Sequence, residues 1–181
     1  MIPQNTILYK EGEAALYKLN RQLREPFKIA LLKELQALTY FKEFGRNTSW
    51  LGEPGLNYIY ANRNHRATGW TKRTKILTDY LIDNIYLEWQ PALNHLLVNQ
   101  YLAGQSLAPH RDDEPDLVGP IVSLSLGDTA TFDYTEGKID LEDGDILVGS
   151  RKFFDTVTHS VSQPHNNQVR YNLTWRTVLA P

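Results

Sequence analysis

The segment VRYNLTWRTV, residues 169–178, alternates polar and apolar side chains from Arg170 to Arg176. Successive side chains of a β-strand point to opposite faces of a sheet, so the pattern predicts a strand with two different faces. The polar face would carry Arg170, Asn172, Thr174 and Arg176, and the apolar face Tyr171, Leu173 and Trp175. A solvated edge strand would show the same alternation, but it gives no reason for two arginines with an amide and a hydroxyl between them.

The β pattern extends back from this segment to Asn94. We expect strands at residues 95–102, 120–126, 129–134, 138–141, 145–148, 158–162 and 169–178. Turn-forming residues such as Gly104, Gly127-Asp128 and Asp143-Gly144 lie between them, as short antiparallel connections require. So many short strands predict a sandwich or a barrel-like jelly roll over residues 94–178, and the family resemblance described below implies the jelly roll, a double-stranded β-helix.

Upstream of this core the pattern is mixed. Ile7–Tyr9 predicts a short strand, and helical spacing of apolar residues predicts helices over Gly12–Leu23 and Thr71–Ile85. Pro26 would interrupt the first helix, and Phe27–Phe44 stays open between a second helix and a mixed segment. The apolar stripe of the helix after residue 70 would be Ile76, Leu77, Tyr80, Leu81 and Ile85. We expect a mainly β, α+β protein whose N-terminal helices pack on one outer face.

Composition limits the classes of function. With 181 residues and 41% hydrophobic composition, the chain is long enough for one well-buried core, and we expect a single domain over residues 1–181. The net charge of −2 excludes a global basic field, so any nucleic-acid binding must use a local patch. The lack of cysteine excludes disulfides and thiolate chemistry. No apolar run is long enough to span a membrane and no signal peptide is evident, so we expect a cytoplasmic protein.

Three residues have the composition of an iron site. His110 and Asp112 form a His-x-Asp pair whose side chains share a face in an extended chain, and His159 follows in a short β-like run. Two histidines and a carboxylate form the facial triad of non-haem Fe(II) oxygenases, which leaves positions open for a co-substrate and O₂. Either motif alone is common in structural or surface roles. The order His-x-Asp, His and then arginine is more specific.

The two arginines suit a dicarboxylate. Six residues of strand span roughly 20 Å, which leaves room for a short ligand held at both ends. Guanidinium groups bind carboxylates through two hydrogen bonds and stay protonated. Asn99 and Tyr101, two residues apart, could offer an amide and a phenol to the same ligand.

These motifs resemble the AlkB family of Fe(II)/2-oxoglutarate-dependent nucleic-acid demethylases over about residues 46–178. The resemblance rests on Asn99-x-Tyr101, His110-x-Asp112, PIVSLSLG (120–127), His159 and Arg170-x-Asn172-x-Thr174-x-Arg176. It implies that His110, Asp112 and His159 ligate iron. It also implies that Arg170, with Asn172 and Tyr101, binds the C5 carboxylate of 2-oxoglutarate, that Arg176, with Asn99, holds the C1 end, and that Thr174 belongs to the same site.

The family also has a nucleotide-recognition lid, which would lie at about residues 46–70 and contain Trp50, Tyr58 and Tyr60. Aromatic side chains stack on bases at about 1–3 kcal/mol each, and a flipped base needs such a pocket. A core role for any one of them stays open. The nearby basic residues would be either a solvated face or a rim that binds the nucleic-acid backbone. They are Arg63, His65, Arg66, Lys72, Arg73 and Lys75.

Two acids follow the metal pair directly, Asp113 and Glu114. They could be solvated loop charges, but the resemblance implies that one of them contacts the exocyclic amino group of a damaged base. The family's target bases are cationic, so a carboxylate would select them electrostatically. We favour Glu114 for this contact. The remaining histidines, His65, His95 and His165, fit no role in the motif and are expected to be surface or structural residues.

The function that the resemblance implies is oxidative demethylation of N-alkylated bases such as 1-methyladenine and 3-methylcytosine. The reaction would use O₂, decarboxylate 2-oxoglutarate and release formaldehyde, succinate and CO₂. We expect a monomer that acts on methylated, single-stranded DNA or RNA. Two alternatives stay open: a 2-oxoglutarate-dependent hydroxylase of a protein or small molecule, and a non-catalytic jelly-roll binding module. The intact triad and both arginines argue against the second alternative.

Overall fold

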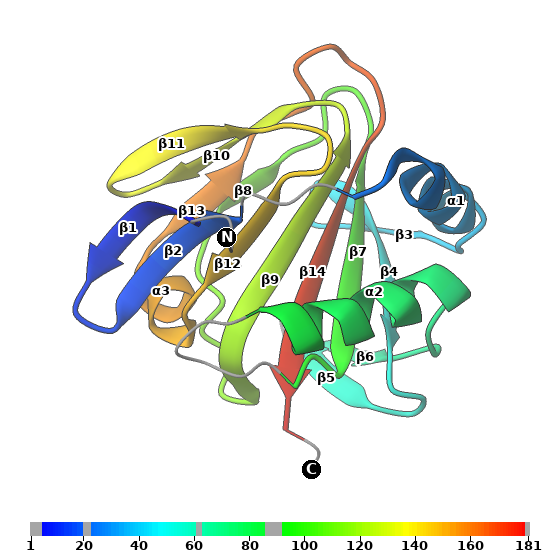
Figure 1. The fold of residues 1–181 in the computed structure, drawn as a ribbon, viewed down its shortest axis with the longest axis horizontal. Helices are drawn as coiled ribbons and strands as arrows, with labels where there is room; N and C mark the ends of the chain where they lie inside the picture. Colours follow the sequence, from blue (N-terminus) through cyan, green and yellow to red (C-terminus); the bar gives the residue numbers. More distant parts are fainter. Residues whose placement is uncertain (1–4, 20–22, 61–62, 86–91, 180–181) are drawn as a thin grey trace.

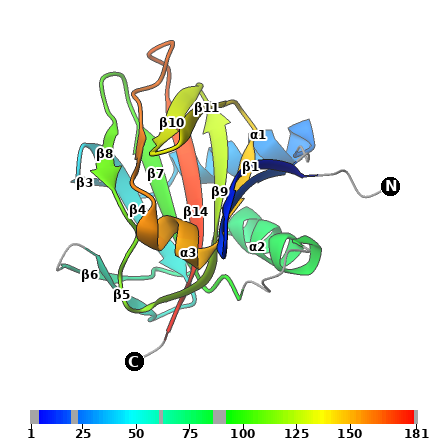
Figure 2. The ribbon, with the colours of Figure 1, turned by 90° about the vertical axis from the view of Figure 1, so that its left-hand side faces the viewer.

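Two antiparallel sheets face each other, and two helices cover the outer side of the larger sheet (Figure 1 and Figure 2). The structure is a computed structural model that describes residues 5–19, 23–60, 63–85 and 92–179. The strand order is β1-β2-β12-β9-β14-β7-β4-β3 in the larger sheet and β11-β10-β13-β8 in the smaller one, and β5 and β6 form a separate hairpin. The predicted jelly roll with helices on one face is confirmed.

The element bounds agree with the sequence prediction through the β-rich part of the chain. The larger sheet contains β1 (Thr6–Glu11), β2 (Ala14–Leu19), β3 (Phe41–Glu43), β4 (Arg46–Gly52), β7 (His95–Tyr101), β9 (Leu117–Gly127), β12 (Ile146–Gly149) and β14 (Arg170–Val178). The smaller sheet contains β8 (Leu107–His110), β10 (Ala130–Tyr134), β11 (Gly137–Leu141) and β13 (His159–Val161). The hairpin is β5 (Asn57–Tyr60) with β6 (Arg63–Arg66), and the helices are α1 (Glu25–Gln36), α2 (Lys72–Asn84) and α3 (Arg151–Thr156). All seven strands predicted after residue 94 are present; β8 and α3 were not predicted.

Strand β14 has the two faces that its alternation predicts. It pairs with β7 on one side and β9 on the other, so it lies inside the larger sheet. The apolar side chains Tyr171, Leu173 and Trp175 pack in the core beneath the helices, and the Trp175 indole N–H donates to Thr78 of α2 at 2.8 Å. The polar side chains point into the space between the sheets, where each is at most 9% exposed. The solvated-edge interpretation of this strand is therefore wrong.

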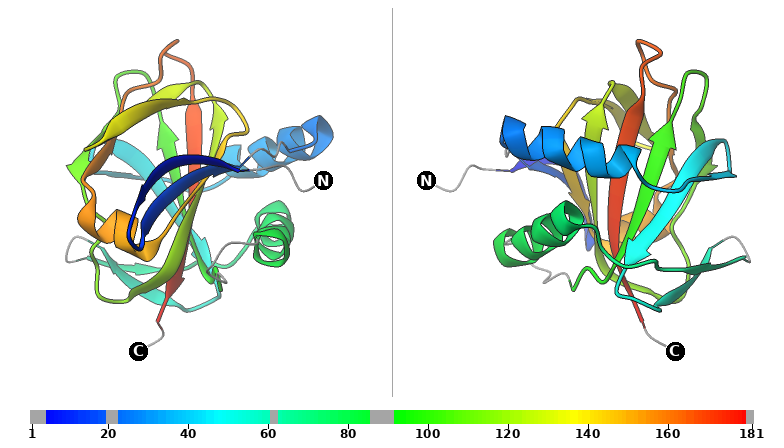
Figure 3. Two further views of the ribbon diagram at one scale, coloured as in Figure 1. Left: turned by 60° about the vertical axis from the view of Figure 1, so that its left-hand side comes forward. Right: turned by 90° about the vertical axis from the view of Figure 1, so that its right-hand side faces the viewer.

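The helices lie side by side on the outer face of the larger sheet (Figure 3). Leu31 and Leu35 of α1 and Leu77 and Leu81 of α2 are buried there. Helix α2 begins after Thr71, whose hydroxyl accepts the Thr74 N–H in a capping box. The helix is confirmed, but its predicted stripe is wrong at two positions. Ile76 and Tyr80 are 48% and 45% exposed, because Thr74 and Thr78 take the buried positions instead.

The helix predicted over Gly12–Leu23 is wrong, because residues 14–19 form strand β2. Its apolar spacing fits either element, and strand pairing with both β1 and β12 satisfies the backbone groups on both edges. Residues 20–22 of that prediction lie outside the described residues. Pro26 does not interrupt a helix but lies in the first turn of α1, where its missing N–H costs nothing. The ambiguous segment after it divides into α1 and β3.

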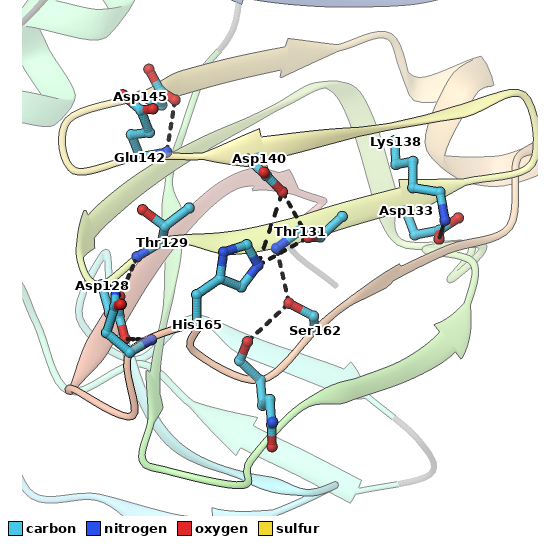
Figure 4. A network of polar contacts seen from close by, with 12 residues as sticks. Asp128, Thr129, Thr131, Asp133, Lys138, Asp140, Glu142, Asp145, Ser162 and His165 are labelled. Carbon is cyan, nitrogen blue, oxygen red and sulfur yellow. Dashed lines mark hydrogen bonds and ion pairs between the residues drawn. The ribbon is translucent and has the colours of Figure 1, made fainter.

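A polar network ties the loop after β13 to the smaller sheet (Figure 4). The Thr131 hydroxyl donates to Asp140 at 2.7 Å and lies 3.0 Å from the His165 imidazole. Asp128 accepts backbone N–H groups from Asn166 and Gln168. His165 is therefore a partly exposed structural residue, as expected.

No helix among the described residues is long and apolar enough to cross a membrane.

His95 is buried in an aromatic cluster rather than at the surface. The side chain is fully buried, with the rings of Trp50 and Tyr58 at 5.5 and 5.1 Å between centroids. Neither ring nitrogen has a hydrogen-bond partner among the described residues. Burial lowers the pKa of His95 to about 3, with smaller contributions from Arg176 and His65. The folded protein therefore keeps this imidazole neutral.

This burial predicts a pH-dependent loss of stability. The pKa of His95 is lower in the folded state than in the unfolded chain, so the unfolded chain binds the extra proton. Stability is then retained above about pH 6.5 and lost as the pH falls toward 3, by up to about 1.4 kcal/mol per pH unit. Urea unfolding at pH 7.5 and 5.5 should show a smaller loss for His95→Leu than for the unsubstituted protein. Equal losses in both proteins would contradict the assignment to His95.

Candidate metal and co-substrate site

Three side chains from two strands and a loop converge between the sheets. His110 ends β8, His159 begins β13, and the two residues are register partners. Asp112 follows two residues after His110. One ligand atom from each of the three lies within 4.8 Å of the others. The structure therefore brings together the triad predicted from the spacing of His-x-Asp and the later histidine.

Both imidazoles are oriented for metal binding. His110 Nδ1 lies 2.9 Å from the Ala108 carbonyl oxygen, and His159 Nδ1 lies 3.1 Å from the Val157 carbonyl oxygen. A carbonyl oxygen can only accept, so each Nδ1 carries a proton and each Nε2 is the nitrogen left for a metal ion. Burial, with a smaller contribution from His159, lowers the pKa of His110 to about 4. The ring is neutral at physiological pH, as a metal ligand must be.

Asp112 completes the donor set as a carboxylate. Its Oδ1 accepts a hydrogen bond from Arg176 at 2.7 Å, and its Oδ2 lies 3.6 Å from His159 Nε2. Burial alone would raise the pKa of Asp112, but Arg176 and His159 hold it well below its usual range. Two imidazole nitrogens and one carboxylate fit Fe(II) with positions left open.

The polar face of β14 lines the same cavity. Arg170 is fully buried; its Nη2 donates to Ser125 at 2.7 Å, and its guanidinium lies 5.3 Å from the centre of the Tyr101 ring. Its Nε and Nη1 atoms have no hydrogen-bond partner among the described residues. A buried donor without a partner is costly, so these groups fit a carboxylate ligand.

Side-chain amides form a hydrogen-bonded chain along the polar face of β14, between Arg170 and Arg176. Asn99 donates to Asn172 at 3.2 Å, Asn172 donates to Ser123 at 2.7 Å, and the Thr174 hydroxyl donates to Asn172 at 2.8 Å. Ser123 and Ser125 were missed, although the alternation in PIVSLSLG places them on one face. Arg46, also missed, lines the cavity from β4, a strand that was not predicted.

The three aromatic residues of the predicted lid are buried beside the triad. Trp50, Tyr58 and Tyr60 are 5%, 0% and 9% exposed. The Arg176 guanidinium lies 5.6 and 6.0 Å from the centres of the two tyrosine rings, so the cluster adjoins the metal site. His65 stacks on Trp50 with ring centroids 3.9 Å apart, and it therefore covers one face of the indole.

Of the two acids, Glu114 is the less exposed. Its Oε2 atom is buried and accepts no hydrogen bond from the described residues, whereas Asp113 is exposed. Burial raises the pKa of Glu114, while Arg176 acts in the opposite direction. Arg151 donates to the backbone carbonyls of Asp112 and Glu114, which fixes this loop.

The structure separates the predicted basic rim into two parts. Arg63 and Arg66 are exposed on the hairpin, beside the aromatic cluster. Lys72, Arg73 and Lys75 are on α2, on the outer face of the larger sheet and away from the cavity (Figure 3). Arg73 forms an ion pair with Glu34, and Lys75 with Asp79. The basic residues of α2 do not border the candidate site, because the apolar face of the helix packs on the outer side of the larger sheet.

Comparison with curated proteins finds three relatives. An RNA replication protein of Grapevine virus A (isolate Is 151) is 32% identical over 143 residues, which cover 74% of this chain and 8% of that protein. The alpha-ketoglutarate-dependent dioxygenases AlkB of Salmonella typhimurium and Escherichia coli are 39% and 38% identical over 104 residues, which cover 50% of this chain. The match spans only 47% of each AlkB protein.

Solved structures share the fold at low sequence identity. A Pseudomonas putida prolyl-4-hydroxylase matches with a TM-score of 0.60 and 14% identity, over 91% of this chain and 92% of its own. An oxidoreductase of the 2OG-Fe(II) oxygenase family from Burkholderia pseudomallei matches with a TM-score of 0.58 and 14% identity, over 89% of this chain and 84% of its own. The model of the 2OG-Fe(II) oxygenase superfamily matches residues 9–176, and thus begins well before the motifs that first indicated the resemblance. The chain therefore belongs to the 2OG-Fe(II) oxygenase superfamily, and its curated relatives include AlkB proteins.

Proposed function

We propose that this protein is an Fe(II)/2-oxoglutarate-dependent dioxygenase that demethylates N-alkylated bases in DNA or RNA. The observation that carries the proposal is the triad of His110, Asp112 and His159, which lines a cavity together with buried guanidinium groups. These three residues would hold Fe(II), which with 2-oxoglutarate and O₂ supplies the oxidation of an N-methyl group. Formaldehyde, succinate and CO₂ would be released.

The chain's own residues would bind and orient the co-substrate. Arg170, whose free N–H groups face the cavity, would bind the C5 carboxylate together with Tyr101 and Asn172. Arg176 would hold the C1 end beside the metal while it keeps Asp112 ionised. Asn99 donates to Asn172 and accepts from Arg46, so we assign it to the middle and far part of the co-substrate rather than to the C1 end.

The substrate base would enter from the aromatic side of the site. The AlkB relatives support this class of substrate. Within residues 46–70, β4 is part of the larger sheet, so the hairpin of β5 and β6 would act as the lid over the core at 94–178, with Trp50, Tyr58 and Tyr60 against the base. Glu114 would contact a cationic base such as 1-methyladenine or 3-methylcytosine, because its buried Oε2 atom accepts no hydrogen bond from the described residues and favours a positive ligand. We further propose a cytoplasmic monomer that acts on single strands.

Removing a triad histidine should abolish metal binding. His110→Ala and His159→Ala each leave two ligands, so we expect at least a ten-fold weaker Mn(II) affinity and the loss of 2-oxoglutarate turnover. His165→Ala is the matched control, because this histidine lies outside the triad and should leave both unchanged. The affinities can be measured by titration calorimetry under nitrogen. Unchanged Mn(II) affinity in both triad variants would refute the metal site.

Incubation with methylated oligonucleotides tests the substrate class directly. With Fe(II), ascorbate and 2-oxoglutarate, we expect mass spectrometry to show loss of one methyl group from 1-methyladenine or 3-methylcytosine, with stoichiometric formaldehyde. Matched single-stranded and duplex DNA and RNA would distinguish the strand preference. Turnover of 2-oxoglutarate that no oligonucleotide stimulates would instead favour a protein or small-molecule hydroxylase.

Glu114→Gln should reduce demethylation more than Asp113→Asn. The first substitution removes a half-buried carboxyl group beside the proposed base site, and we expect kcat/KM to fall about ten-fold or more for the cationic bases. The second removes an exposed charge and should have less than a two-fold effect. Steady-state kinetics with one methylated oligonucleotide would measure both. Equal effects of the two substitutions would contradict the assignment of the base contact to Glu114.

A further inference from the structure

Arg46 is a buried arginine to which the sequence motifs give no role. Its side chain is 1% exposed and lines the cavity from the first residue of β4. Thr48 pairs with Asn99, so Arg46, two residues earlier, shares the inward face and follows in register opposite Tyr101. Tyr101 in turn pairs with Arg170. Arg46, Tyr101 and Arg170 therefore form one row across three neighbouring strands, at the end of the cavity far from Arg176.

Arg46 determines the direction of the amide chain in the cavity. Its Nε donates to Asn99 Oδ1 at 2.5 Å, and its Nη1 donates to the Phe44 carbonyl at 3.3 Å. A guanidinium can only donate, so Asn99 must present its oxygen to Arg46 and its NH₂ group to Asn172. Asn172 then presents its own NH₂ group to Ser123. Among the described residues, Arg46 is the one donor to Asn99 Oδ1, so it holds the amide in this orientation.

The far end of the cavity also has an unbalanced charge. Among the described residues, Arg176 forms an ion pair with Asp112, but neither Arg46 nor Arg170 lies within 4.0 Å of a carboxylate. Tyr101 lies between the two guanidinium groups in the row. Burial raises the pKa of its phenol, and both guanidinium groups act in the opposite direction. Asp128 acts on Arg170 only from beyond 4.0 Å. Two buried cations without an ion-pair partner are costly to the folded protein, and a carboxylate ligand at this end would reduce that cost.

We propose that Arg46 is a second cationic group for the far carboxylate of the keto acid, alongside Arg170, and a positioning residue for Asn99. It makes the cavity selective for a dicarboxylate over a keto acid that lacks the second carboxylate. The inference rests on the proposed co-substrate site and extends it by a residue from a different strand. Arg170 alone would supply one guanidinium at this end; Arg46 doubles the positive charge there.

Binding measured without turnover tests this role. Protein loaded with Mn(II) under nitrogen is titrated with 2-oxoglutarate and with 2-oxopentanoate, in which a methyl group replaces the far carboxylate. Arg46→Gln should weaken 2-oxoglutarate about 10- to 100-fold, the range for a lost hydrogen bond to a charged group, and 2-oxopentanoate less than two-fold. Arg46→Lys, which keeps the charge, should lie between. Arg66→Gln, an exposed arginine on the hairpin, should leave both affinities unchanged.

Two results would overturn the proposal. Unchanged 2-oxoglutarate affinity in Arg46→Gln would show that the guanidinium does not reach the ligand. Equally weakened binding of both ligands would show that Arg46 acts on the fold or on Asn99 alone. A comparison of Asn99→Ala with the double variant Arg46→Gln/Asn99→Ala checks this. Direct contact of Arg46 with the ligand predicts an additional loss of 2-oxoglutarate affinity in the double variant. If Arg46→Gln does not fold, Arg46→Lys gives the same comparison. Failure of the unsubstituted protein to bind 2-oxoglutarate would instead refute the proposed function itself.

Discussion

The site depends on one buried strand having two chemically different faces. Strand β14 lies between β7 and β9 in the larger sheet, with the helices packed on one face and the smaller sheet opposite the other, so neither face is solvated. Its apolar residues hold the helices on the outside, and the Trp175 contact with Thr78 anchors α2 there. Its polar residues consequently line the space between the sheets, because the period of a strand leaves them no other direction. The same alternation therefore fixes the core and builds the cavity.

The buried charges in this cavity indicate which ligands it could bind. Three guanidinium groups, from Arg46, Arg170 and Arg176, are at most 4% exposed, and of these Arg176 has an ionic partner among the described residues. Removing a charge from water costs several kcal/mol unless a counter-charge is present. The three buried arginines of the described residues lie together, next to a triad whose donor atoms suit Fe(II). A divalent cation and a dicarboxylate together would satisfy both the vacant imidazole nitrogens and the unpaired guanidinium groups.

The sequence predicted those features that follow from local periodicity and spacing. The strands after residue 94, the jelly roll, the triad and the inward face of β14 all depend on alternation and turn residues that are visible along the chain. Features that depend on tertiary pairing were not predictable. Residues 14–19 fit a helix or a strand equally, and pairing with β1 and β12 decides between them. Arg46 lies in a segment rich in turn-forming residues, and its place in the cavity follows only from the pairing of β4 with β7. The basic residues near the lid lie in two separate places, on the hairpin and on α2, because α2 packs on the outer face of the sheet. Composition alone does not show where that helix packs.

The most direct test of this account is a crystal structure of the protein with Mn(II) and 2-oxoglutarate, in which anomalous scattering locates the metal. We expect one metal ion in bonding distance of Nε2 of His110, Nε2 of His159 and a carboxylate oxygen of Asp112, with the co-substrate extending from it toward Arg170. A metal ion bound elsewhere, or a co-substrate that lies outside the space between the sheets, would contradict it.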